Sequence, residues 1–169
     1  MKKLIRVSLL SLLGLMGCKD TKPLATVASV DLAKYVGTWH EIASYPSRFQ
    51  KGCNCTTATY TLEGDHVKVD NKCFRDGKWD GIVGKAFVTE GTNNTKLKVQ
   101  FFWPFKGDYY IIDLAHDYSH ALVGHPNRDY LWVLSRSATM DAAIYNQLLA
   151  RATALGFDVA LLVKTPLGC

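Results

Sequence analysis

The chain has 169 residues, a formal net charge of +5, 48% hydrophobic residues and 21% charged residues. This length is enough for one domain with a sizeable core. Residues 1–17 contain three basic residues and no acidic ones, so residues 18–169 carry a net charge of only +2. No basic run is present that would indicate a nucleic-acid-binding protein.

Residues 1–17 have the pattern of a lipoprotein signal peptide. A basic start precedes an apolar stretch over residues 7–16, which is too short to span a bilayer as a helix. The stretch ends in Leu15-Met16-Gly17-Cys18, which resembles a bacterial lipobox and implies cleavage before Cys18 and a lipid on Cys18. A plain secretory signal with an incidental Cys18 is the alternative. Lys19 stands where an Asp would resemble an inner-membrane retention signal, which favours the outer membrane.

We expect residues 18–30 to form a polar, lipidated tether and residues 31–169 to form the folded domain. From residue 38 onward, short runs rich in Val, Ile, Thr and aromatic residues are separated by turn signals. Short links join antiparallel neighbours, and eight such strands can close into an up-and-down barrel with room for one small ligand. The predicted strands span residues 38–45, 56–62, 66–73, 81–89, 96–103, 109–114, 121–124 and 130–135.

One helix is predicted after the strands, over residues 141–155. Its apolar residues Ile144, Leu148 and Leu149 lie on one face. Thr139 is the predicted N-cap and Gly156 the predicted stop. Residues 157–163 are predicted to form a final strand or extended segment. The fold class is therefore all-β, with one C-terminal helix.

Three short motifs indicate a family: Gly37-Thr38-Trp39, Asp117-Tyr118 and Trp132-Val133-Leu134-Ser135-Arg136. In this order, each at the end of a strand-like run, they resemble the motifs of the lipocalins. The chain is similar to the bacterial outer-membrane lipoprotein lipocalins, the apolipoprotein D-like branch, although His40 replaces their usual Tyr. The resemblance implies a barrel that holds a small apolar ligand and a helix packed outside it. It also implies that Arg136 packs on Trp39 at a closed end, where an indole can exclude water.

Four cysteines remain beyond Cys18, and an even number in an exported protein predicts two disulfides. Pairing across the turn at residues 63–65 places residues whose numbers sum to about 128 opposite each other, which favours Cys55–Cys73 and leaves Cys53–Cys169. A one-residue bulge would favour Cys53–Cys73 and Cys55–Cys169 instead. A metal site is the alternative use of these cysteines, but no His pair sits at ligand spacing, and no metal is expected.

Alternating strand directions separate the two ends of the barrel. The links 63–65, 90–95 and 115–120 lie at the closed end and bring Asp117 and Tyr118 beside Trp39. The links 45–55, 74–80, 104–108 and 125–129 form the mouth, which is rich in aromatic and cationic residues. We interpret the mouth as a rim that meets an anionic head group or a membrane surface, with an ordinary mixed surface as the alternative.

Alternation along each strand predicts which side chains face inward. The inward positions are Trp39, Glu41, Ala43 and Tyr45 on the first strand, Leu97, Val99, Phe101 and Trp103 on the fifth, and Tyr130, Trp132 and Leu134 on the eighth. The candidate ligand-binding residues are Tyr45, Phe49, Tyr60, Trp79, Phe101, Trp103, Tyr109, Tyr130 and Trp132. The candidate closed-end motif comprises Gly37, Trp39, Asp117, Tyr118 and Arg136.

A buried aromatic wall with few polar groups suits an acyl chain. We expect binding, storage or transport of a single-chain lipid, such as a long-chain fatty acid or a lysophospholipid, at the outer membrane with the barrel in the periplasm. A role in membrane maintenance is implied only by the family. No cofactor is expected, and no nucleophile elbow, phosphate loop or metal-ligand pair indicates an enzyme. The alternative is a tethered barrel that contacts a periplasmic partner without a stable ligand.

Overall fold

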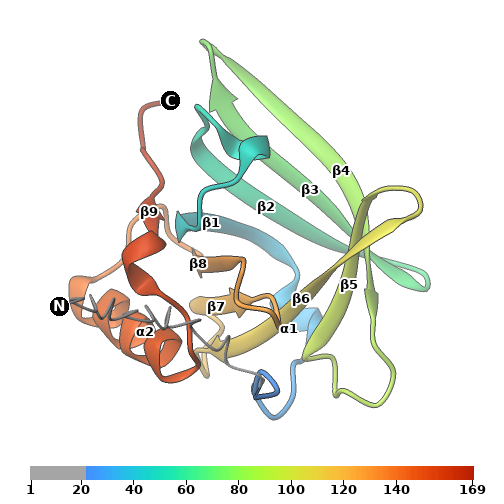
Figure 1. The fold of residues 1–169 in the computed structure, drawn as a ribbon. Coiled ribbons are helices and arrows are strands. Elements are labelled where there is room, and N and C mark those ends of the chain that lie inside the picture. Colours follow the sequence, from blue (N-terminus) through green and yellow to red (C-terminus); the bar gives the residue numbers. More distant parts are fainter. Residues whose placement is uncertain (1–21) are drawn as a thin grey trace, which may run out of the picture.

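A computed structural model describes residues 22–169, so the predicted signal peptide and Cys18 lie outside the described residues (Figure 1). Eight antiparallel strands form a closed barrel in which each strand pairs with the next and β8 pairs with β1. A ninth, two-residue strand, β9, pairs with β1 at its end. The strands are β1 (Gly37–Ser44), β2 (Asn54–Glu63), β3 (His66–Arg75), β4 (Lys78–Val88), β5 (Lys96–Phe102), β6 (Phe105–Leu114), β7 (His120–Gly124), β8 (Leu131–Ser135) and β9 (Val163–Lys164).

The eight-strand barrel confirms the predicted fold class. The main differences in length lie at the mouth, where β4 and β6 begin at Lys78 and Phe105 instead of at residues 81 and 109. These two strands extend the β3–β4 and β5–β6 hairpins, because their residues continue to pair beyond the predicted ends.

Helix α2 (Ala142–Ala154) packs outside the barrel, as the family resemblance implies (Figure 1). Its N-cap is Asp141 rather than the predicted Thr139, since the Asp141 carboxylate accepts hydrogen bonds from the backbone N–H of Ala143 and Ile144. Beyond α2, the predicted extended segment 157–163 is instead a 3-10 turn, η2 (Val159–Leu161), followed by β9. Two further short elements, α1 (Leu32–Tyr35) and η1 (Arg48–Gln50), were not predicted.

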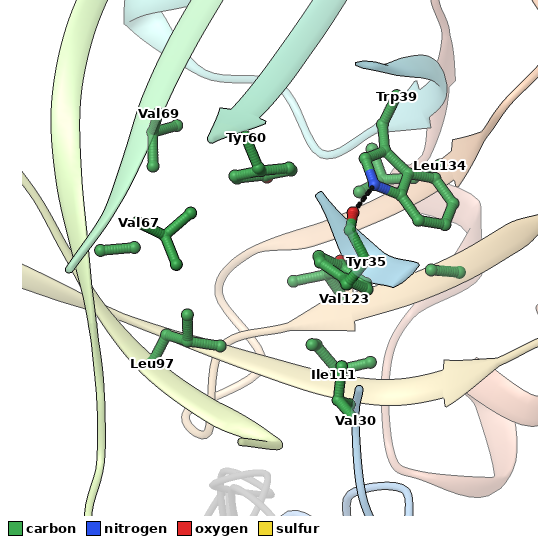
Figure 2. Packing of buried hydrophobic residues seen from close by; sticks show 12 residues of the cluster. Val30, Tyr35, Trp39, Tyr60, Val67, Val69, Leu97, Ile111, Val123 and Leu134 are labelled. Carbon is green, nitrogen blue, oxygen red and sulfur yellow. Dashed lines mark hydrogen bonds between the residues drawn. The ribbon is translucent and has the colours of Figure 1, made fainter. Parts of the chain in front are cut away.

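Two apolar clusters hold the fold together. The inner cluster lies inside the barrel and includes Trp39, Tyr60 and Val69 (Figure 2). The outer cluster lies between the barrel wall and α2, where Leu148 and Ala152 pack with residues of β7 and β8. Gly124 permits this close contact, because a Cβ atom there would lie 2.5 Å from the Phe157 ring.

A bulge in β1 changes which of its side chains face inward. The β1–β8 register shifts between Glu41 and Ala43, so residues beyond the shift exchange faces. The predicted inward positions of Ala43 and Tyr45 are therefore wrong: both belong to the outer cluster. The Tyr45 hydroxyl donates to the Asp158 carbonyl oxygen at 2.8 Å, beyond α2, which also excludes Tyr45 as an interior ligand contact.

Part of the predicted tether, residues 18–30, is packed on the barrel. Leu24 and Val30 are buried in the outer and inner clusters, and the Val27 N–H donates to the Ile111 carbonyl oxygen at 3.0 Å. At the start of the described residues, the chain contacts the β7–β8 turn, where Arg128 Nη2 donates to the Lys22 carbonyl oxygen at 2.9 Å. Residues 24–30 are thus packed on the barrel.

The disulfides join Cys53 to Cys73 and Cys55 to Cys169, with Cα–Cα distances of 5.3 Å and 6.2 Å. The favoured pairing of Cys55–Cys73 and Cys53–Cys169 is therefore wrong, and the bulged alternative is correct. The physical reason is the register shift in the β2–β3 ladder between Asn54 and Thr57. Cys55 lies within this shift with a φ of 49°, so it is displaced from Cys73 and bonds to the C-terminal tail.

Candidate ligand-binding site

The closed end is built around Arg136 and Trp39. The Arg136 guanidinium lies 3.9 Å from the centre of the fully buried Trp39 ring. It also donates to backbone carbonyl oxygens on two sides of the closed end, including those of Thr38 and Tyr118. Its Nη2 reaches the carbonyl oxygens of Lys34, Tyr35 and Val36 at 2.8–3.0 Å. One side chain thus ties the turn at residues 117–119 to α1 and β1.

The other members of the predicted closed-end motif lie in the same place. Gly37 has a φ of 95°, and a Cβ there would lie 3.3 Å from Arg136 Nη1, so a larger residue would be strained and crowded. The Tyr118 hydroxyl accepts from the Asp31 N–H at 2.9 Å. The exposed Asp117 carboxylate accepts from the Ser119 N–H, and hydrogen bonding to the Ser119 side chain, together with this backbone bond, lowers the pKa of Asp117. The structure therefore brings all five motif residues together.

Three tyrosines place their hydroxyl groups together on the inner side of this closed end. The Tyr109 hydroxyl lies 2.7 Å from that of Tyr35 and 3.0 Å from that of Tyr60. Burial raises the pKa of Tyr60 to about 12 and raises those of Tyr35 and Tyr109 as well. The contribution of Tyr35 was missed because α1 was not predicted, although Asp31 carries the N-cap signal that precedes a helix.

The barrel wall contains four of the nine candidate ligand-binding residues. Tyr60 belongs to the buried inner cluster, and the others pack against it while remaining partly accessible: Phe101, Tyr109 and Trp132. The Trp132 ring stacks on that of Tyr130, with 5.9 Å between ring centres and an interplanar angle of 8°. These side chains give the interior an aromatic wall that leads from the tyrosines toward the mouth.

Four other candidates form an exposed rim, which we define as Phe49, Trp79, Trp103 and Tyr130 together with Phe102 and Phe105. The predicted inward position of Trp103 is wrong, because the β5–β6 register shifts after Val99 and β5 ends at Phe102. Trp103 is 86% exposed and Phe105 is 77% exposed, both at the β5–β6 hairpin. Trp79 follows the β3–β4 turn, and Phe49 lies in η1 beside the cationic Arg48. The rim is thus a surface feature, which meets the interior wall where Tyr130 stacks on Trp132.

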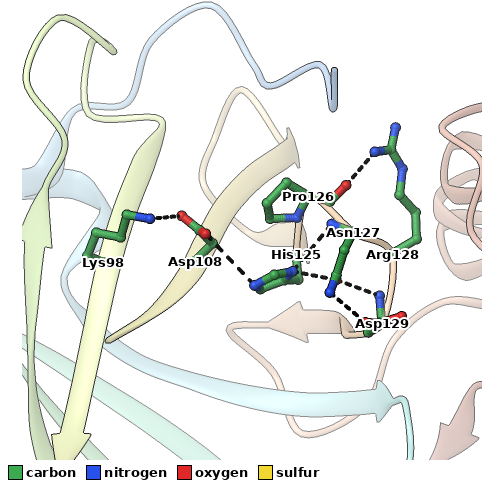
Figure 3. A network of polar contacts seen from close by, with 7 residues as sticks. All are labelled: Lys98, Asp108, His125, Pro126, Asn127, Arg128 and Asp129. Carbon is green, nitrogen blue, oxygen red and sulfur yellow. Dashed lines mark hydrogen bonds and ion pairs between the residues drawn. The ribbon is translucent and has the colours of Figure 1, made fainter. Parts of the chain in front are cut away.

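A polar network supports the β7–β8 turn at the mouth (Figure 3). Lys98 Nζ lies 2.6 Å from Asp108 Oδ1, and His125 Nε2 lies 3.9 Å from Asp108 Oδ2. His125 Nδ1 also contacts the Asn127 side chain, whose amide group donates to Asp129. The network fixes the turn that carries Arg128, which in turn holds the backbone at Lys22.

A pocket of about 390 Å³ lies at the mouth between β1, the β1–β2 loop, β2 and the C-terminal tail. Glu41, predicted to face inward, lines it and is only 8% exposed. Glu41 Oε1 accepts from the hydroxyls of Thr165 and Ser44 at 2.7 and 3.1 Å, and Oε2 accepts from Gln50 Nε2 at 2.7 Å. In the sequence, the only indication of this polar pocket was that strand alternation predicted an inward position for the charged residue Glu41, among apolar neighbours.

Within residues 22–169, no group of three or more His, Cys, Asp or Glu side chains is placed to hold a metal ion. No helix in the same residues is long and apolar enough to cross a membrane.

Comparison with known proteins agrees with this architecture. The lipocalin-like domain family matches residues 30–167. The chain is 42% identical to the outer membrane lipoprotein Blc of Escherichia coli K12 over 151 residues, which cover 86% of this chain and 85% of Blc. It is 41% identical to temperature-induced lipocalin-1 of Arabidopsis thaliana (87% and 84% covered) and 36% identical to rat apolipoprotein D (77% and 73% covered).

Among solved structures, insecticyanin from the tobacco hornworm Manduca sexta superposes with a TM-score of 0.69 at 22% identity, covering 89% of this chain and 86% of insecticyanin. Lipocalins are binding and transport proteins for small hydrophobic ligands. The barrel, the Trp39–Arg136 closed end and these matches lead to one conclusion: this chain belongs to the lipocalin family.

Proposed function

We propose that this lipocalin binds one single-chain lipid, such as a long-chain fatty acid or a lysophospholipid, with its acyl chain inside the barrel. The observation that carries the proposal is the partly accessible aromatic wall of Phe101, Tyr109 and Trp132, which leads away from a sealed closed end. Burial of an acyl chain gains about 0.8 kcal/mol per methylene group before entropic losses. A wall of this kind therefore suits a long, unbranched chain.

We further propose that the protein acts at the outer membrane, held by a lipid on Cys18, with its barrel in the periplasm. Several relatives carry the name outer membrane lipoprotein, and the segment before Cys18 resembles a lipobox. The rim supports contact with a bilayer, because exposed aromatic side chains lie near Lys78, Lys106 and Arg48 at the same end of the barrel.

Two adjacent residues of β5 give a direct test of ligand binding. Phe101 packs against the inner cluster, while its neighbour Phe102 is exposed on the rim. Delipidated protein should show a calorimetric signal and a change in Trp fluorescence when a single-chain lipid is added. Phe101→Ser should weaken this binding roughly tenfold or more, because a buried Phe contributes about 1.5–3 kcal/mol, whereas Phe102→Ser should have little effect. The absence of any signal with all such lipids would exclude lipid carriage.

The second candidate function is an interaction barrel that contacts a periplasmic partner without a stable ligand. The exposure of Trp103 and Phe105 favours it, because exposed apolar patches also mark protein interfaces. A native mass spectrum of freshly purified protein separates the two functions. A copurifying lipid of defined mass supports lipid binding. The mass of the protein alone, together with no binding of added lipid, supports the interaction barrel.

A further inference from the structure

We propose that the mouth pocket beside Glu41 binds the ammonium group of the lipid head, so that the protein prefers a single-chain lipid with a primary-amine head group. The inference rests on the proposed lipid-binding function and names the chemistry of its ligand. It depends on three features of this pocket: a buried carboxylate that forms no ion pair within the described residues, a buried hydroxyl without a partner there, and three cationic side chains on the same lining.

The first feature is the electrostatic situation of Glu41. Buried charges in proteins are normally paired with an opposite charge. The Glu41 carboxylate receives only neutral donors, from Ser44, Gln50 and Thr165, and it takes part in none of the ion pairs found within residues 22–169. A carboxylate offers about four lone-pair positions, so Oε2 retains capacity for one more donor.

The second feature is Thr56, which lines the same pocket from β2. It is 9% exposed, and within the described part of the chain its Oγ1 has no hydrogen-bond partner. Buried polar atoms are rarely left unpaired, and an unpaired one points to a missing partner. An ammonium group carries three donors, of which Glu41 Oε2 and Thr56 Oγ1 can accept two.

The third feature is the positive charge elsewhere on the lining. Arg48 and Lys51 border the pocket from the β1–β2 loop, and Lys164 borders it from β9, where its ammonium also lies over the Tyr145 ring. A head group with both an ammonium and a phosphate would place its cation at Glu41 and its anion near Arg48 and Lys51. A head group with only hydroxyls would leave Glu41 without a cation, and a fatty acid would add a second carboxylate, so both should bind less well.

The test compares three ligands with the same acyl chain: lysophosphatidylethanolamine, lysophosphatidylglycerol and the free fatty acid. Titration calorimetry on the delipidated protein should give the lowest Kd for lysophosphatidylethanolamine. Glu41→Gln preserves the shape of the side chain and should weaken that ligand about tenfold or more, while changing the other two much less. Glu63→Gln, at the β2–β3 turn of the closed end, is the matched control and should change none of the three.

A purely structural role for Glu41 predicts a different result. If Glu41→Gln weakens all three lipids equally, or none, or if the wild-type protein does not prefer the amine, the inference is wrong while lipid binding stands. If the wild-type protein binds none of the lipids, the proposed function itself fails. Should Glu41→Gln not fold, Thr56→Val supplies the same test: it removes one hydroxyl and should weaken lysophosphatidylethanolamine selectively, and an unselective result would overturn the inference.

Discussion

The two ends of this barrel differ in how their large aromatic side chains are buried and in how the chain is held. At the closed end, Trp39 is fully buried and the Arg136 guanidinium reaches five backbone carbonyl oxygens and the face of the indole. At the mouth, Trp103 is almost fully exposed, the Thr56 hydroxyl has no partner within the described residues, and two disulfides hold the chain in place. The closed end is thus held by a buried indole and one guanidinium, whereas the mouth leaves apolar side chains exposed and is held by covalent bonds.

The largest expected effect on stability is the difference between removing the indole at the closed end and removing one at the mouth. Trp39→Ala should lower the free energy of unfolding by about 3–5 kcal/mol, because a large buried side chain is lost and a cavity remains. Trp103→Ala should change it by less than about 0.5 kcal/mol, because the side chain is exposed. Urea denaturation of both variants measures the difference, and equal losses would contradict the division between the two ends.

The next effect concerns the disulfide between Cys55 and Cys169. The double variant Cys55→Ser with Cys169→Ser should lose about 2–4 kcal/mol, since the unfolded chain regains the freedom of a long loop. Amides that exchange only by global unfolding should therefore speed up by the full loss in stability, whereas β9 and adjacent parts of β1 and β2 should speed up more, because the released tail also opens locally. Hydrogen exchange measures both, and an increase in β9 no larger than that at Ile111 and Ala121 would show that the mouth and the closed end unfold as one unit.

A third prediction uses the tyrosines near the closed end. Burial raises the pKa of Tyr60 from 10.0 to about 12, so the folded protein holds this proton more tightly than the unfolded chain does. The resulting stability is complete below pH 10 and is lost as the pH rises through about 12, at about 1.4 kcal/mol per pH unit for one group. Denaturation midpoints should therefore fall more steeply over this range for the wild-type protein than for Tyr60→Phe. Parallel slopes would refute the assignment.

The smallest effect on stability is expected for the rim. Trp103→Ser with Phe105→Ser, in the full chain made unlipidated by Cys18→Ser, should leave the fold intact but weaken binding to vesicles of phosphatidylethanolamine and phosphatidylglycerol roughly fivefold or more. Leu62→Ser is the control, because Leu62 is exposed at the opposite end, beside the β2–β3 turn. Cosedimentation measures the binding. An equal loss of vesicle binding with Leu62→Ser would show that the rim is not the membrane-contacting surface.

Sequence reasoning predicted the barrel well because strand alternation and turn signals are local properties. It also placed Trp39, Asp117 and Arg136 at one end, since alternating strand directions leave little choice for an up-and-down barrel. It failed at the bulges in β1 and β2, where one additional residue reverses the faces of those that follow. The errors at Tyr45 and at the disulfides both have this origin.

The polar part of the mouth was harder to predict for another reason. Glu41 is a single charged residue in a strand with otherwise ordinary alternation. Its hydrogen-bond partner Thr165 lies 124 positions later in the sequence. The same holds for the N-terminal segment, whose polar composition suggested a tether although Val27 and Val30 bond to the backbone of distant residues. Contacts of this kind depend on the completed fold and leave no local pattern.

The bond between Arg128 and the Lys22 carbonyl oxygen fixes where the chain leaves the barrel, which is beside the mouth. Cys18 stands four residues before Lys22, and four residues span at most about 14 Å in any conformation. A chain with a lipid on Cys18 would therefore keep its opening close to the bilayer that anchors it, at a high effective concentration.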